Sequence, residues 1–187
     1  WKVSRALEIS IDTLVEPRVF HGEESTQQIW SDVLETLRTP GDYMCVSGID
    51  ESQFLLADSK QLLNFIATLK ARGFSQKLLC CEGDTKFLEG DHLEYRAIPK
   101  EHFNPTPIYV YGDRIAMLTW GPPQQAIIIQ NAVLADAYRK QFLFIWSHAM
   151  PVQNGPGKRG TAKRVSAPTG ANTKRSAKRV SKGKRPA

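Results

Sequence analysis

Acidic side chains follow two of the predicted strands, at the edge where a sheet with parallel strands usually carries its ligand crevice. Asp50 and Glu51 come after one apolar run, and Glu82 and Asp84 come after another. Ser47, Asp50 and Glu82 are therefore our candidate effector contacts, because hydroxyls and carboxylates hydrogen-bond a polyol or a sugar. Alternatively, the acidic residues cap the helices that follow, where the helix dipole favours negative charge. The sequence leaves both interpretations open.

The other reactive residue types show no spacing that predicts catalysis or metal binding. The four histidines lie far apart, without an HxxxH or HExxH pattern. The three cysteines form no CxxC pair, and the adjacent Cys80 and Cys81 would point to opposite faces of a strand. The sequence contains no nucleophile elbow, phosphate-binding loop or dinucleotide fingerprint. We therefore predict no catalytic residue, no metal and no cofactor, and the odd cysteine count favours a reducing cytoplasm.

Charge divides the chain at Pro151. The 187 residues carry a net charge of +6, yet no Asp or Glu follows this proline, so residues 1–151 hold fourteen basic and nineteen acidic residues. The segment 151–187 lacks aromatic residues and large aliphatic ones, which predicts a disordered tail. Its cations can neutralise nucleic-acid phosphates without reading bases; the alternative is a tail that only solubilises the chain or folds back on its acidic body. The candidate nucleic-acid-binding residues are Lys158, Arg159, Lys163, Arg164, Lys174, Arg175, Lys178, Arg179, Lys182, Lys184 and Arg185.

Apolar periodicity predicts a single α/β domain between a helical segment and this tail. Residues 1–16 carry an apolar stripe of Val3, Leu7, Ile11 and Leu14, and Pro17 ends that helix. The longest apolar run is far shorter than the ~18 residues of a membrane span. Over 17–150 we predict strands at 18–21, 43–48, 76–81, 92–98, 108–111, 114–120 and 125–130. Helices are predicted after a capping box at Ser25 and Gln28, before Gly73, and after a cap at Asn131.

The segments Ile108–Ala116, Gln125–Asn131 and Ala137–Trp146 are similar to the carboxyl-terminal half of the TrmB-like transcriptional regulators. They resemble that family's "YGD-(K/R)-(V/I)-A" hairpin, its "AIIIEN" strand and its closing "A-x-x-F-R-x-x-F-x-x-x-W" helix. Upstream, 17–22 and 94–99 resemble the family's entry to the domain and its "R-x-(L/I)-P" strand. The likeness covers about residues 17 to 147.

The resemblance implies a phospholipase D-like effector domain with a mixed sheet flanked by helices, in a regulator that also has a winged helix-turn-helix and a dimerising linker helix. No winged helix precedes Trp1 in this sequence, and the first residue is not Met. We therefore expect that residues 1–16 are the end of a linker helix that forms a homodimer, and that the chain is a piece of a longer protein. In some members the effector domain senses sugars, which implies a small-molecule partner here.

The fold implied by this resemblance also raises the possibility of phosphodiester cleavage. Active phospholipase D-like enzymes carry His-x-Lys-x-x-x-x-Asp, in which the His attacks phosphorus. Aligning Asp113 with the Asp of that motif puts Thr106 at the His and Ile108 at the Lys. Neither side chain can serve, so we predict that the chain is not an enzyme.

The sequence thus predicts a non-catalytic, effector-binding and dimerising region of a cytoplasmic, nucleoid-associated TrmB-like regulator whose basic tail adds nonspecific affinity for DNA. The alternative is a stand-alone nucleic-acid-associated protein that binds through its tail. A further alternative is an enzyme with an unrecognised site that involves Asp50 or Glu82.

Overall fold

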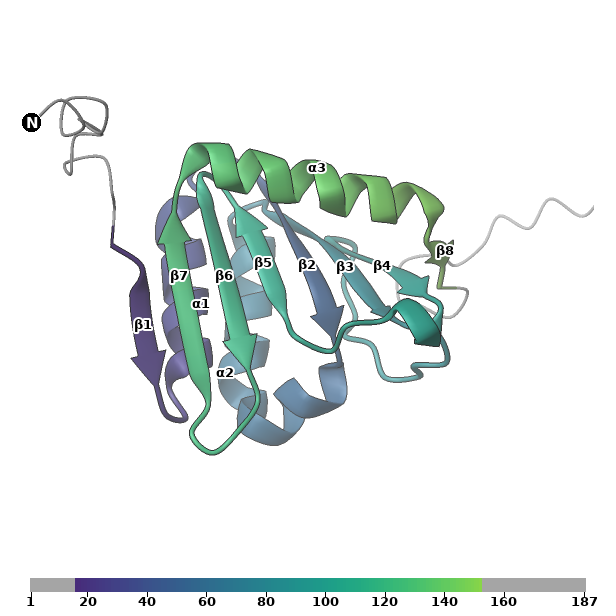
Figure 1. Cartoon of the computed structure of the whole chain (residues 1–187), viewed down its shortest axis with the longest axis horizontal. Coiled ribbons are helices and arrows are strands. Elements are labelled where there is room, and N and C mark those ends of the chain that lie inside the picture. Colours follow the sequence, from purple (N-terminus) through teal and green to yellow (C-terminus); the bar gives the residue numbers. More distant parts are fainter. Residues whose placement is uncertain (1–15, 153–187) are drawn as a thin grey trace, which may run out of the picture.

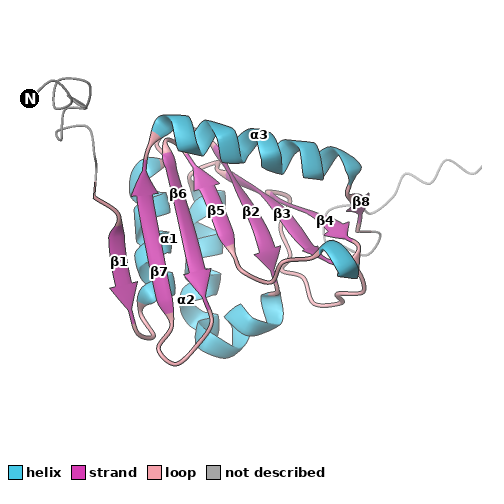
Figure 2. Cartoon of the chain, viewed as in Figure 1, coloured by secondary structure: helices cyan, strands magenta, loops and turns pink. Residues whose placement is uncertain are grey.

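The computed structural model describes residues 16–152 and shows strands and helices around one sheet (Figure 1; Figure 2). The predicted linker helix, apart from Glu16, and the predicted tail beyond Val152 lie outside these residues. The elements in chain order are β1 (Arg18–His21), α1 (Ser25–Thr36), β2 (Tyr43–Ile49), α2 (Glu51–Ala71), β3 (Ser75–Cys81), β4 (Leu93–Ile98), the 3-10 turn η2 (Lys100–His102), β5 (Ile108–Tyr111), β6 (Arg114–Thr119), β7 (Gln125–Gln130), α3 (Ala132–His148) and β8 (Met150–Pro151).

The strands form one mixed sheet of eight in the order β1-β7-β6-β5-β2-β3-β4-β8. β2, β3 and β4 are parallel, because helix α2 and a long loop provide the connections that parallel strands need. β5, β6 and β7 form the predicted antiparallel meander, and β1 pairs with β7 at one edge. β8, which no sequence pattern predicted, pairs with Arg96 and Ala97 of β4 at the other edge.

Helices cover both faces of the sheet, but they do so unequally. α1 and α2 pack on one face over a large core that includes Trp30, Phe65 and Tyr109. On the other face, α3 is the one helix of residues 16–152, and it packs Phe142 and Trp146 over the middle strands. Figure 1 shows α1 and α2 behind the sheet and α3 in front of it, near one end of the strands. The predicted fold class, a mixed sheet flanked by helices, is confirmed.

The helix ends agree with two of the three predicted signals. The Asn131 side chain accepts a hydrogen bond of 3.0 Å from the Leu134 amide and caps α3. Gly73 follows α2 with φ of 73°, a conformation that glycine adopts without steric cost. The predicted capping box at Ser25 is wrong: Glu24 is the N-cap residue and Ser25 is already helical. Its hydroxyl instead lies 3.4 Å from the Gln124 carbonyl oxygen, because the neighbouring loop reaches this helix end.

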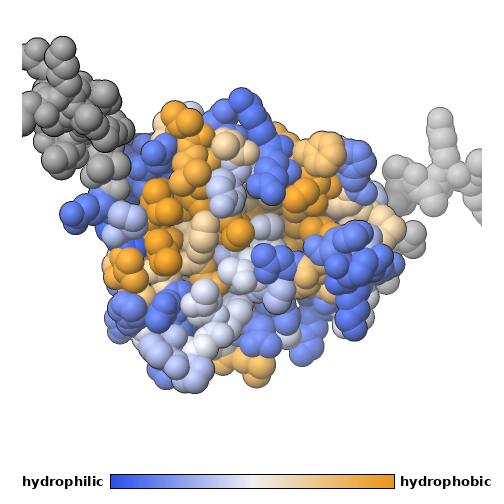
Figure 3. Space-filling model, viewed as in Figure 1, coloured by the Kyte–Doolittle hydropathy of each residue, from blue (hydrophilic) through white to orange (hydrophobic). Residues whose placement is uncertain are grey.

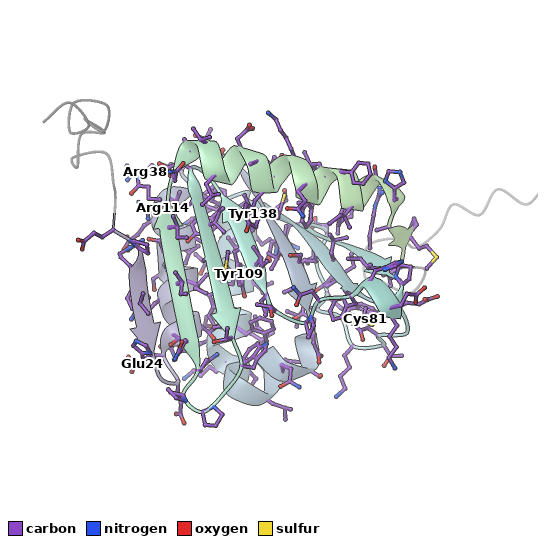
Figure 4. All side chains as sticks on the ribbon, viewed as in Figure 1. Glu24, Arg38, Cys81, Tyr109, Arg114 and Tyr138 are labelled. Atoms are coloured by element: carbon purple, nitrogen blue, oxygen red, sulfur yellow. The ribbon has the colours of Figure 1, made fainter. Side chains whose placement is uncertain are left out.

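A buried carboxylate, Asp32 of α1, ties the edge of the sheet together. It is 3 % exposed and accepts hydrogen bonds from the side chains of Arg18, Arg114 and Tyr111, the last at 2.7 Å. Burial by itself raises the pKa of Asp32, but these hydrogen bonds outweigh burial and hold the pKa below its usual value. Tyr111 and Arg114 flank the Gly112-Asp113 hairpin, so this motif joins α1 to β5 and β6. Arg114 is labelled in Figure 4.

Candidate functional site

A cavity of about 300 Å³ lies between α3 and the sheet, near the carboxyl end of β2. The strands contribute one wall, α3 contributes the opposite wall, and the segment that includes η2 closes one side. In Figure 4 the labelled Tyr138 lies between α3 and the strands beneath it. The lining residues are Ser47, Gly48, Leu79, Ile98, His102, Asn104, Ile108, Val110, Tyr138, Gln141, Phe142 and Ile145.

The wall at the end of β2 depends on a glycine. Gly48 has φ of 72°, and the pairing register of β2 with β3 shifts between Val46 and Ile49. A Cβ atom on Gly48 would lie 2.3 Å from the carbonyl oxygen of Thr106 and 2.7 Å from that of Asn104. The backbone before β5 therefore passes directly over β2, and only a residue without a side chain fits there.

The lining combines apolar side chains with neutral polar ones. Ser47, Asn104 and Gln141 offer hydroxyl and amide groups, whereas Ile108 and Phe142 offer apolar surface. The lining includes no Asp, Glu, Lys or Arg; His102 is the lining residue that can carry a positive charge. This composition suits a small neutral ligand with hydroxyl groups and an apolar face.

The three predicted effector contacts do not lie together. Ser47 lines this cavity, whereas Asp50 lines a separate hollow of about 200 Å³ with Asp84, and Glu82 is exposed. Asp50 is the N-cap of α2, where it accepts a hydrogen bond of 3.0 Å from the Ser52 amide, as the capping interpretation predicts. Ser47 lies before the end of β2 and faces the cavity under α3, whereas Asp50 lies beside the loop after β3, in the hollow that Gly83 and Asp84 also line. Their roles in ligand binding stay predictions.

The cysteines are not poised for chemistry. Cys45 and Cys80 are buried in the sheet, and burial raises their thiol pKa values to about 11 and about 12. A protonated thiol is a weak nucleophile. The side chain of Cys81 is only partly buried, which agrees with the predicted placement of neighbouring cysteines on opposite sides of a strand.

Glu51 is a buried carboxyl group that the sequence analysis did not single out from its neighbours. It is 6 % exposed, begins α2, and accepts a hydrogen bond from the Tyr95 hydroxyl. Burial raises its pKa to about 7, in spite of this hydrogen bond. Glu51 lines a void of about 20 Å³ together with the buried Gln76, whose amide nitrogen has no hydrogen-bond partner within residues 16–152. This void lies against the α1 and α2 core, so Glu51 is remote from the cavity under α3.

The alignment positions of the phosphodiesterase motif do lie at the cavity. Ile108, aligned with the catalytic Lys, lines it, and the backbone of Thr106, aligned with the catalytic His, packs on Gly48. His102, four residues earlier, also lines the cavity and comes from η2. A histidine side chain is thus present at a spacing that the motif alignment did not consider.

The remaining predictions concern the basic tail, metal binding and membrane spans. The basic residues of the predicted nucleic-acid-binding tail all lie outside residues 16–152. Over residues 16–152 no group of three His, Cys, Asp or Glu side chains could hold a metal ion, and no helix is long and apolar enough to cross a membrane.

Comparisons with known proteins identify the fold. No family model matches the sequence, and no curated protein matches it. NucT from Helicobacter pylori has a similar structure, with a TM-score of 0.52 and 5 % identity, over 73 % of this chain and 99 % of that one. Nuc from Salmonella typhimurium, a phospholipase D family member, has a TM-score of 0.51 and 13 % identity, over 73 % and 99 % of the two chains. TrmBL2, an archaeal chromatin protein with a novel mode of DNA binding, gives a TM-score of 0.49 and 15 % identity over 80 % of this chain; the chain spans 58 % of its length.

These comparisons correct the prediction that the chain is not an enzyme. That prediction depended on two residues at fixed spacing before Asp113, but the same fold occurs in Nuc, a member of an enzyme family. Loss of the motif at those positions is therefore no ground for excluding catalysis, because a fold brings together side chains that are not at motif spacing. At these levels of identity the likeness concerns architecture. The chain has a phospholipase D-like fold, with a mixed eight-stranded sheet and helices on both faces.

Proposed function

We propose that this chain is the ligand-sensing domain of a nucleic-acid-associated regulator of the TrmB-like type. The observation that carries the proposal is the cavity of about 300 Å³ under α3, which joins neutral polar groups to an apolar wall. Cavities of this size and composition are the usual sites for small molecules. The resemblance of the hairpin and of α3 to TrmB-like regulators supports the same assignment.

The ligand class follows from the chemistry of the lining. A sugar presents hydroxyl groups to Ser47, Asn104 and Gln141 and can place its less polar face against Phe142. The lining has no acidic residue and no Lys or Arg to pair with a charged ligand. We therefore expect neutral saccharides to bind better than sugar phosphates.

The nucleic-acid part of the proposal depends on charge in the sequence. Every Lys-Arg pair beyond Pro151 is free of nearby acidic residues, which suits contact with phosphates. We expect that deletion of 152–187 weakens DNA binding and flattens its salt dependence. Complete loss of DNA affinity in this deletion would instead favour the alternative of a protein that binds nucleic acid through its tail alone.

The cavity is tested by calorimetric titration of the whole chain with a panel of mono- and disaccharides. Replacement of Gln141 by Ala removes an amide group from the lining, whereas Lys140→Ala changes the neighbouring exposed position on the outer side of α3. We expect a saccharide that binds the wild type and Lys140→Ala equally and Gln141→Ala about tenfold more weakly. Equal binding by all three proteins, or binding by none, would refute the sensing role of this cavity.

A second candidate function is phosphodiester hydrolysis at the same cavity, because His102 lines it and a histidine can attack phosphorus. The test is release of nitrophenol from bis(p-nitrophenyl) phosphate. We expect His102→Gln to abolish turnover and His148→Gln, at the exposed end of α3, to leave it unchanged. Turnover that survives in His102→Gln, or its absence in the wild type, would reject this candidate.

A further inference from the structure

A row of apolar side chains crosses the α3 face of the sheet beyond the helix itself. Val19 of β1 pairs with Ile127 of β7, Ile127 pairs with Met117 of β6, and Met117 pairs with Ile108 of β5. Their neighbours in the strands, such as Phe20, belong to the core under α1 and α2. Since successive side chains of a strand point to opposite faces, this row faces the α3 side. We call Val19, Ile127 and Met117 the apolar strip.

The strip is exposed where α3 does not reach. Val19 is 49 % exposed, and Ile127 and Met117 are half-buried. The two described cores include neither Val19 nor Ile127, and Met117 only borders the core under α3. At the start of α3, Val133 is 83 % exposed. Figure 3 shows hydrophobic side chains at the surface on the β1 and β7 side of this face.

The chain itself supplies a segment that matches this surface. Residues 1–16 run directly into β1, which carries Val19, and their sequence has the apolar stripe of Val3, Leu7, Ile11 and Leu14. A helix over residues 3–14 would be about 17 Å long. The three strands of the strip span about 10 Å from β1 to β6. One such helix is therefore long enough to cover the strip and to reach toward Val133.

We propose that residues 3–14 dock as an amphipathic helix on the apolar strip of their own chain. The same stripe is predicted above to pair with a second copy. The short connection through Pro17 favours the chain's own sheet, because a tethered segment has an effective concentration in the millimolar range. The polar residues Lys2, Arg5 and Glu8 lie off the apolar stripe and would face solvent.

Limited trypsin digestion of the whole chain tests this docking. Cleavage after Arg5 reports the segment, and cleavage after Arg159, in the tail predicted from composition to be disordered, is the internal reference. We expect cleavage after Arg5 to be at least about tenfold slower than cleavage after Arg159, since the segment must undock first. Equal rates at the two sites would overturn the proposal.

Two variants locate the surface that protects Arg5. Met117→Ser combined with Ile127→Ser alters the strip, and Leu7→Ser combined with Ile11→Ser alters the segment without touching the described domain. We expect both to bring the Arg5 rate to that of Arg159, and we expect the Leu7 and Ile11 variant to remain a monomer of 21.0 kDa. Two outcomes would reject docking on the same chain and assign the stripe to a second copy. In the first, Arg5 stays protected from trypsin in the strip variant. In the second, the wild-type protein has twice this mass and loses the protection of Arg5 on dilution.

Discussion

The two faces of the sheet differ in how completely their side chains are packed. Under α1 and α2, the side chains form a continuous core with the Asp32 network at one edge and Glu51 at the other. Under α3, a smaller core adjoins a cavity and an apolar strip that α3 leaves partly exposed. The difference indicates that the first face is closely packed, whereas the second face keeps an open cavity.

The largest expected effect comes from the Asp32 network. Replacement of Asp32 by Ala leaves the part-buried guanidinium of Arg114 and the Tyr111 hydroxyl without their partner. We expect the free energy of unfolding to fall by about 3 kcal/mol or more. Urea denaturation measures this loss, and Asp136→Ala on the exposed side of α3 is the control, with an expected change below about 0.5 kcal/mol. Similar losses in both variants would contradict the contrast between the two faces.

The second effect is a pH dependence from Glu51. Its folded pKa of about 7 lies above the usual 4.5, so the folded protein binds a proton that the unfolded chain has released. The stabilisation from this group is therefore complete below about pH 4.5 and is lost as pH rises through 7, by up to about 3 kcal/mol. The measurement is urea denaturation between pH 5 and pH 8. Glu51→Gln should remove this decline, and the exposed Glu94→Gln should keep it.

The third effect is local to the cavity. In Gly48→Ala the new Cβ would overlap the Thr106 carbonyl oxygen, whereas in Gly83→Ala, also at positive φ, a Cβ meets no atom within 4 Å. We expect both variants to lose about 1 kcal/mol from the backbone conformation and Gly48→Ala to lose about 2 kcal/mol more. Thermal unfolding measures the difference. Equal losses would show that the backbone over β2 is free to move.

The smallest effect concerns the attachment of α3. Asn131→Ala removes the cap hydrogen bond to the Leu134 amide and should lower the free energy of unfolding by about 1 kcal/mol. Amide hydrogen exchange should increase in the first turn of α3 and stay unchanged in α1. Faster exchange in both helices would mean that the two faces unfold as one unit.

Much of the fold was predictable because it depends on local signals. Gly73 and Asn131 mark element ends through their own backbone or side-chain chemistry, and the Gly112-Asp113 turn joins the predicted hairpin. The helix predicted to end at Pro17 lies outside the described residues. The prediction of a capping box at Ser25 was wrong because the Ser25 hydroxyl donates a hydrogen bond to the carbonyl oxygen of Gln124, in a loop remote in sequence. The short β8 was missed because its pairing depends on β4, more than fifty residues earlier in the chain.

The candidate site was less predictable. Ser47, Asp50 and Glu82 were grouped because strands end near them, but Ser47 lines the cavity under α3, Asp50 caps α2 and Glu82 is exposed. His102 and Gln141 line the cavity from two elements that are remote in sequence, so no spacing could identify them. Asp50 and Glu51 are adjacent acidic residues in the sequence. Only the folded structure shows that Glu51 is buried, whereas Asp50 caps α2.

The sequence by itself determined the order of strands and helices from β1 to α3, the acidic body and the basic segment after Pro151, because periodicity, turn residues and charge act locally along the chain. Only the tertiary structure decided which face each helix covers, where a cavity remains and which carboxyl groups lose their water. These properties depend on contacts between segments far apart in sequence, and burial, which sets both packing and pKa, exists only once those contacts form.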